Sequence, residues 1–266
     1  MTLQSEQIQN YLIFCKQQKK LSVSTTKAYG IDLSQFFAFH ANAEEKLTRN
    51  NICDYITHLH ETYKPRTAKR KIASLKAFCR YLECEELIEK NPFDKINIKF
   101  QEPRVLPRTI PISDIQIILK TAYNERQRPD ISEYYHAAII RDIAVLELLF
   151  ATGMRVSELC SLKHENINFS ENIIRVFGKG SKERVIQISN KEVIDALLLY
   201  ILAFQTNNDA YFFVNRLGNR LSEQSVRFMI RKYVELAGIS SHITPHMFRH
   251  SCKDKFIGWV NAKAER

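Results

Sequence analysis

Glycine and proline are scarce in this sequence, with seven of each among 266 residues. So few turn-forming residues argue against a disordered chain and against an all-β fold with many tight turns. The longest apolar stretch, Val193 to Phe204, contains Asp195 and is shorter than the roughly 20 residues that span a bilayer. These absences predict a mainly helical protein that does not enter a membrane.

Paired cysteine motifs and a secretory leader are also missing. Six cysteines are scattered through the chain with no Cys-x-x-Cys spacing, which argues against a zinc site and suits a reducing compartment. No Asp, Glu and His cluster has metal-ligand spacing, and the first seven residues lack the charged and apolar regions of a signal peptide. We expect a soluble, cytoplasmic protein without a metal or other cofactor.

Positive charge, in contrast, is abundant. The formal net charge is +10 and the isoelectric point is about 9.3. This excess favours a polyanionic partner, which is either nucleic acid or an acidic membrane face, over a merely basic protein. Charge alone leaves both kinds of partner open.

The length of the chain predicts two domains. We place an N-terminal helical domain at residues 1–93 and a linker at 94–111, which carries Pro103, Pro107 and Pro111. The second domain, residues 112–266, has mixed α/β character. Its apolar periodicity predicts helices at about 113–123, 135–152, 156–162, 191–204 and 222–237. Ser189 and Glu192 form a capping-box pair before the fourth of these. Turn signals and short apolar runs predict strands at 173–177, 184–188 and 211–215.

The N-terminal domain is expected to contain four helices, and the fourth has a basic face. Apolar residues recur at helical spacing in four segments. The first runs up to Cys15, the second covers about 24–40, the third follows the N-cap residue Thr48, and the fourth runs from Pro65 to about Leu82. No acidic residue lies between positions 64 and 80, so this helix can lie against a phosphate backbone. The cations that we assign to DNA contact are Lys64, Arg66, Lys69, Arg70, Lys71, Lys76 and Arg80.

Three short segments of the second domain carry cations suited to phosphate chemistry. They are Ala-Thr-Gly-Met-Arg-Val-Ser-Glu-Leu with Arg155, Gly-Lys-Gly-Ser-Lys-Glu-Arg with Lys179, and Thr-Pro-His-Met-Phe-Arg-His with His246 and Arg249. In-line attack on a phosphodiester adds charge to two non-bridging oxygens, which two arginines and a histidine can hold. A lysine on a hairpin can protonate the leaving oxygen. Glu158 is expected to pair with or orient Arg155.

Together these segments resemble the active site of the tyrosine recombinases, the phage integrase family, and most closely its Xer-like branch. The resemblance implies a helical, SAM-like core-binding domain and a mixed α/β catalytic domain that close as a C-shaped clamp on DNA. It implies that Arg155 and Arg249 clamp the scissile phosphate, that His246 assists them, and that Lys179 is the acid for the 5′ oxygen. Family members cut through a 3′-phosphotyrosine, work as homo- or hetero-tetramers, and need neither ATP nor metal.

The family's nucleophile has no counterpart among these residues. In the family a tyrosine follows the His-x-x-Arg box, whereas here no tyrosine follows Tyr233. The family pattern also stops after Ser251, which leads us to expect a truncation or frameshift and a catalytic domain that is incomplete at its C-terminus. Tyr211 and Tyr233 precede the box and match no nucleophile position.

Three functions remain open from the sequence. The first is a tyrosine-type site-specific recombinase, or the remnant of one. The second is a DNA-binding regulator that occupies recombination sites without cutting them. The third, a nicking enzyme of the type IB topoisomerase kind, uses similar cations and requires the same tyrosine, and the Ala-Thr-Gly-Met-Arg segment favours the integrase class over it.

Overall fold

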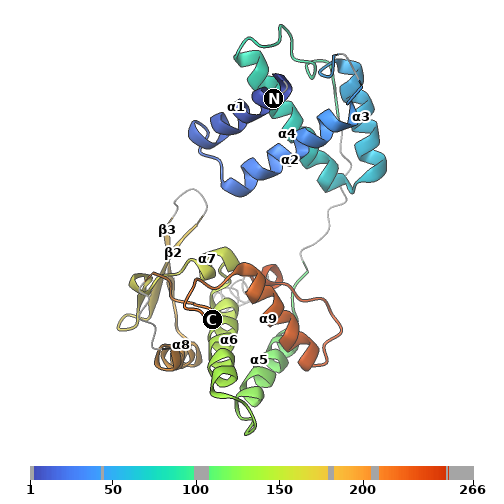
Figure 1. Cartoon of the computed structure of the whole chain (residues 1–266). Coiled ribbons are helices and arrows are strands. Elements are labelled where there is room, and N and C mark those ends of the chain that lie inside the picture. The colour runs from blue at the N-terminus through green and yellow to red at the C-terminus, as the bar shows by residue number, and fades with distance from the viewer. Residues whose placement is uncertain are drawn as a thin grey trace, which may run out of the picture. The chain divides into compact units, whose positions relative to one another are not determined.

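The computed structural model describes residues 3–42, 45–98, 108–178, 183–204, 210–249 and 251. The chain forms two compact units, Met1–Val105 and Leu106–Arg266 (Figure 1). Ile96 and Ile98 pack against the core of the first unit, and Ile110 is buried in the core of the second. The predicted linker therefore contributes apolar side chains to both units from its two ends.

The N-terminal unit contains the four predicted helices. They are α1 (Leu3–Gln17), α2 (Val23–Phe39), α3 (Arg49–Thr62) and α4 (Pro65–Cys84). Thr48 caps α3 as predicted, because its side chain accepts a hydrogen bond of 3.2 Å from the Asn51 amide. Pro65 opens α4 at a position where the missing amide hydrogen leaves no partner unsatisfied.

Aromatic side chains fill the core of this unit. Tyr11 and Phe78 meet edge to face with ring centroids 5.2 Å apart, and Phe36 meets Tyr55 in the same way at 5.1 Å. All four side chains are buried. Their contacts join each of the four helices to at least one other, which holds the exposed side of α4 in a fixed orientation.

A buried ionic cluster connects α2 to α4. Asp32 accepts hydrogen bonds from Lys71 Nζ at 3.2 Å and from Ser74 Oγ at 2.9 Å, and it also pairs with Arg70. Lys71 further contacts Gln35 and lies over the ring of Tyr63. The exposed fraction is 1% for the Asp32 side chain and 4% for the Lys71 side chain, so the Lys71 ammonium depends on Asp32 for compensation, whereas Asp32 also has Arg70.

The C-terminal unit is built around one long helix. Helix α6 (Glu133–Thr152) has ten buried residues and contacts α5 (Ile112–Arg126), α7 (Val156–Cys160), α8 (Lys191–Phe204) and α9 (Glu223–Leu236) (Figure 1). Ser132 and Ser222 cap α6 and α9. The predicted helices of this unit are therefore confirmed, with ends that differ by a few residues.

A small antiparallel sheet lies at one side of α6 and α8 (Figure 1). It contains β1 (Ile167–Asn168), β2 (Ile173–Phe177) and β3 (Glu183–Gln187) in that order, after a 3₁₀ turn at His164–Asn166. The register pairs Val176 with Arg184. The fold is thus mainly helical with a small sheet, as the sequence predicts, and the described residues form three strands of that sheet.

Two local predictions differ from the structure, and one strand was not predicted. The amide of Glu192 bonds to Asn190 Oδ1 at 3.2 Å, so Asn190 rather than Ser189 caps the start of α8. Residues 211–215 form only an isolated bridge between Val214 and Arg220. Strand β1, with two residues, is too short for a periodic pattern to reveal. Among the described residues, no helix combines the length and apolarity needed to cross a membrane.

Replacing Asp32 with Ala should destabilise the N-terminal unit by about 3–5 kcal/mol, because the buried Lys71 ammonium loses its carboxylate. Chemical denaturation followed by circular dichroism measures the free energy of unfolding. The matched variant Lys71→Met should cost less, since Asp32 keeps Arg70 and Ser74. Equal losses for the two variants would contradict a cluster that is organised by Asp32.

Candidate phosphate-binding site

A tight turn after α6 positions the first predicted arginine. Gly153 ends the helix with φ 56° and ψ 25°, a left-handed conformation that favours glycine, and its amide bonds to Leu149 O at 3.0 Å. Two residues later, Arg155 is the N-cap residue of α7. The turn therefore places Arg155 directly beside the end of the central helix, with its side chain exposed.

Glu158 holds Arg155 in place. Its carboxylate accepts a hydrogen bond of 2.8 Å from the Arg155 backbone amide and one of 2.7 Å from Arg155 Nη1. It also accepts two bonds from Arg184 on β3, at 3.0 and 2.7 Å. The predicted pairing of Glu158 with Arg155 is confirmed, whereas the sequence pattern carried no signal for the contribution of Arg184.

The pKa of Glu158 reports the strength of this arrangement. Burial alone would raise the pKa, but hydrogen bonds from Arg184 and from the backbone and side chain of Arg155 lower it to about 2, against an ordinary value of 4.5. The hydrogen bond to Glu158 in turn raises the pKa of Arg184. The carboxylate is therefore ionised at neutral pH and joins two cations.

A short helical segment over residues 245–249 carries the second arginine and the histidine. Phe248, 1% exposed, anchors this segment in the core. Ser251 Oγ accepts a bond of 2.7 Å from the Ile110 amide and lies 3.0 Å from Met247 O. These contacts fix the segment against the chain that leads into α5, so that His246 and Arg249, three residues apart, are held together.

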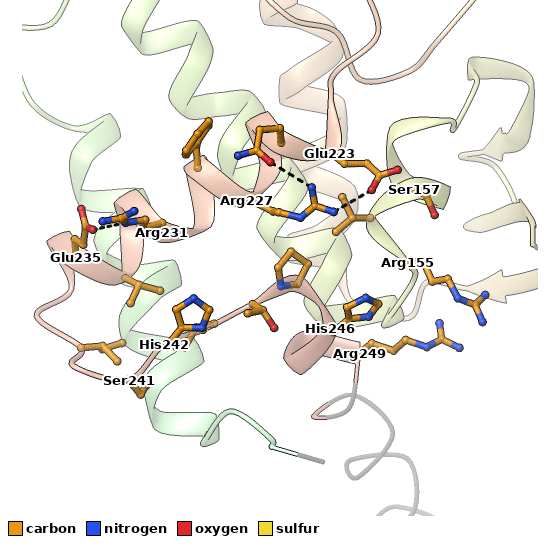
Figure 2. A pocket seen from close by; sticks show the side chains of 18 of the residues that line it. Arg155, Ser157, Glu223, Arg227, Arg231, Glu235, Ser241, His242, His246 and Arg249 are labelled. Carbon is orange, nitrogen blue, oxygen red and sulfur yellow. Dashed lines mark hydrogen bonds and ion pairs between the residues drawn. The ribbon is translucent and has the colours of Figure 1, made fainter. Parts of the chain in front are cut away.

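Arg249 reaches across to the turn that carries Arg155. Its Nη1 donates a hydrogen bond of 2.8 Å to Gly153 O. Figure 2 shows the side chains of Arg155 and Arg249 extending toward the same side of the site, with His246 next to Arg249. Three of the four predicted catalytic residues, from segments about 90 residues apart in sequence, thus come together.

The three side chains line one pocket of about 740 Å³. Its apolar lining includes Met154, Val234 and Ile243, and α9 contributes further charged residues that the sequence did not single out. Of these, Arg227 pairs with Glu223 at 3.1 Å and Arg231 pairs with Glu235 at 2.7 Å (Figure 2). In this pocket the carboxylates neutralise the α9 arginines, while Arg155 retains positive charge because Glu158 is shared.

The fourth predicted catalytic residue, Lys179, lies outside the described residues. It belongs to the connection between β2 and β3, residues 178–182, of which 179–182 are not described. The two strands pair from Phe177 with Glu183 down to Ile173 with Gln187. The two strands of the predicted hairpin are therefore formed, and the placement of Lys179 at its tip stays a prediction.

The cations of α4 need one correction. Lys71 is buried in the Asp32 cluster and cannot face solvent, so it does not belong to a DNA-contact surface. The other predicted cations of this helix are exposed, and the spacing of Arg66, Lys69, Lys76 and Arg80 places them along one stripe. Arg70 is exposed over 48% of its side chain although it pairs with Asp32.

Metal ligands do not gather in the part of the chain that the structure describes. No group of three or more His, Cys, Asp and Glu side chains there could hold a metal ion. Positive charge at the site comes from Arg155 and Arg249, and hydrogen-bond donors on these side chains and on His246 are suited to the oxygens of a phosphate group.

Comparisons with known proteins define the class of the chain. Residues 122–257 match the model described as the phage integrase family, and residues 8–86 match its N-terminal SAM-like domain. A tyrosine recombinase of Agathobacter rectalis is 44% identical over 253 residues, which cover 92% of this chain and 80% of that protein. The chain therefore belongs to the phage integrase family.

Two further similarities place it more narrowly. The tyrosine recombinase XerC of Thermodesulfovibrio yellowstonii is 32% identical, and the alignment covers 92% of this chain and 80% of that protein. The structure resembles that of XerH site-specific recombinase bound to difH substrate in a pre-cleavage complex, with a TM-score of 0.70 and 17% identity, over 93% of this chain and 73% of that one. These matches confirm the Xer-like branch and the fold.

The lowered pKa of Glu158 predicts a pH dependence of stability. Because the folded-state pKa is about 2 and the ordinary value 4.5, ionised Glu158 stabilises the fold above pH 4.5, and this contribution is lost as the pH falls toward 2. The difference in unfolding free energy between wild type and Glu158→Gln should therefore shrink over that range in denaturant titrations. A difference that stays constant over that range would contradict the account.

Proposed function

We propose that this protein is a site-specific DNA recombinase that cuts and rejoins strands through a 3′-phosphotyrosine. The observation that carries the proposal is the convergence of Arg155 and Arg249 at the Gly153 turn, with His246 beside them. Two planar guanidinium groups that extend toward the same side of the site can bind both non-bridging oxygens of a single phosphate. Membership of the phage integrase family supports the same chemistry.

Each side chain has a role in this proposal. Arg155 and Arg249 stabilise the charge that develops on the phosphate oxygens, and His246 assists them and handles protons. When a tyrosine oxygen bonds to phosphorus, the bond to the 5′ oxygen breaks and Lys179 donates a proton to that oxygen. In the joining step the 5′ hydroxyl attacks, Lys179 takes its proton, and the phenolic oxygen leaves.

Tyr233 does not qualify as the attacking group. Its side chain is fully buried, its hydroxyl lies 3.4 Å from Asp142 Oδ2, and burial together with the Asp142 charge raises its pKa. The guanidinium carbon of Arg220 lies over the ring of Tyr211, 5.4 Å from the ring centroid. Since no tyrosine follows Tyr233 in these 266 residues, the joining step, whose nucleophile is DNA, is the direct test of this site.

Double-stranded DNA is the proposed partner, and the exposed cations of α4 are its proposed contact in the N-terminal unit. The net charge of +10 supports a polyanionic partner. The family resemblance supports a homo- or hetero-tetramer on DNA. The described cysteines are all free, which supports the cytoplasm as the compartment.

The joining step can be measured with a nicked duplex whose 3′ end carries a 4-nitrophenyl phosphate, an activated mimic of the phosphotyrosine. Attack by the adjacent 5′ hydroxyl forms the phosphodiester and releases nitrophenolate. A library with randomised flanking sequence, followed by sequencing of joined products, removes the need to know the target site. The proposal expects joined products that share a sequence.

Variants assign the reaction to the site. Arg249→Ala should slow joining about 10²–10³-fold and Lys179→Ala about 10²–10⁴-fold, with folding nearly unchanged. Arg231→Ala is the matched control, because Arg231 lines the same pocket but pairs with Glu235. If wild type binds DNA but joins none, the recombinase proposal is contradicted, and a regulator that occupies sites without cutting them is favoured.

The α4 surface makes a separate prediction. Each phosphate contact contributes about 0.9 to the slope of log affinity against log salt concentration, so the triple variant Arg66→Gln, Lys76→Gln, Arg80→Gln should reduce the slope by about 3. Fluorescence anisotropy with labelled duplex measures it. The control is Lys16→Gln, Lys19→Gln, Lys20→Gln, which removes the same charge from other exposed positions. Equal slopes for the two triple variants would contradict a DNA contact on α4.

A further inference from the structure

The Glu158 carboxylate is shared between two arginines from different elements. Oε1 accepts bonds from Arg155 Nη1 and Arg184 Nη1, and Oε2 accepts bonds from the Arg155 amide and Arg184 Nη2. Two oxygens thus receive four donors, and the Glu158 side chain is only 4% exposed. Bidentate pairing of this kind fixes the orientation of both partners as well as their distance.

The position of Arg184 on the hairpin gives this bond a particular meaning. Arg184 is the second residue of β3, five positions after Lys179, and it pairs with the buried Val176 of β2. Its neighbours Glu183 and Val185 are exposed, so Arg184 points from the hairpin to the α7 side while they point to solvent. Arg184 is therefore the hairpin's attachment to Glu158 and, through Glu158, to Arg155.

We propose that Arg184 is a positioning residue that fixes the orientation and the charge of Arg155 in the phosphate clamp, through the shared carboxylate of Glu158. The inference rests on the proposed function, because it concerns an arginine that would hold the phosphate. Arg184 itself touches neither the scissile phosphate nor the leaving oxygen in this account.

The bond between Arg184 and Glu158 also affects the net charge at the site. One carboxylate between two guanidinium groups leaves a net charge of +1 at the site. Without Arg184, Glu158 pairs with Arg155 alone, and both carboxylate oxygens become available to the Arg155 side chain. That pairing neutralises Arg155 and draws its donors away from a phosphate, so loss of Arg184 weakens the hold of Arg155 on that phosphate.

The joining assay separates this role from a general loss of charge. Arg184→Gln should slow joining on the order of 10²-fold while DNA affinity changes little, since a displacement of about 1 Å at a reacting group has that effect. Arg184→Lys keeps the positive charge but cannot form the two hydrogen bonds to Glu158. Its joining rate should lie between those of wild type and Arg184→Gln. Arg175→Gln is the matched control, because Arg175 lies on the exposed face of the same hairpin.

A double-mutant cycle with Glu158→Gln tests whether the effect passes through the carboxylate. The proposal expects Arg184→Gln to slow joining far less when Glu158 is already replaced. An undiminished effect in that background means that Arg184 acts on DNA directly and overturns the proposal. A lowered melting temperature with an unchanged joining rate shows a purely structural role and also overturns it.

A measurement without DNA keeps this inference distinct from the proposed function. The Nε–Hε resonance of Arg155 in the free, isotope-labelled chain should shift in Arg184→Gln and in Glu158→Gln, and stay in place in Arg175→Gln. Failure of wild type to join DNA, together with these shifts, refutes the recombinase proposal and leaves the link intact. Absence of a shift in Arg184→Gln refutes the link whatever the joining assay shows.

Discussion

The left-handed turn at Gly153 is the constraint on which the site depends. Its amide closes the last turn of α6 on Leu149 O, and its carbonyl accepts the bond from Arg249. One residue therefore ends the central helix, sets the start of α7 with Arg155, and receives the second arginine. A side chain at this position would strain the backbone at φ 56° and displace both cations.

Around this turn, the protein handles charge in two different ways. Acidic partners pair with arginines that line the rest of the pocket, as Glu223 pairs with Arg227. Beside Arg155, in contrast, the single carboxylate of Glu158 pairs with both Arg155 and Arg184. Positive charge therefore remains where a phosphate would bind. The same logic separates Lys71, which is buried with Asp32, from the exposed cations of α4. Burial against an acid, rather than residue type, decides which cations can meet DNA.

Much of the fold could be predicted because its signals are local. Helical periodicity and the N-cap at Thr48 are each properties of a few adjacent residues, and each predicted its element. The grouping of Arg155, His246 and Arg249 followed from family resemblance together with the chemistry of phosphate binding. Periodicity could not bring them together, since their approach depends on how Phe248 and Ser251 pack.

The features that sequence reasoning missed are contacts between distant residues. Lys71 lies in a basic run and looks like its neighbours, and only the packing of α2 against α4 buries it beside Asp32, 39 positions away. Arg184 is one more cation in a hairpin until β3 brings it to Glu158, 26 positions away. Neither pairing has a spacing rule, because a tertiary contact between a helix and another element leaves no period in the chain.

The central claim is that Arg155 and Arg249 hold a single phosphate. A crystal structure of the protein bound to a nicked duplex of the sequence selected in the joining reaction tests it most directly. The account predicts guanidinium nitrogens of both residues within about 3 Å of non-bridging oxygens on the same phosphate, with His246 adjacent. Arginines bound to two different phosphates, or turned away from the DNA, would contradict it.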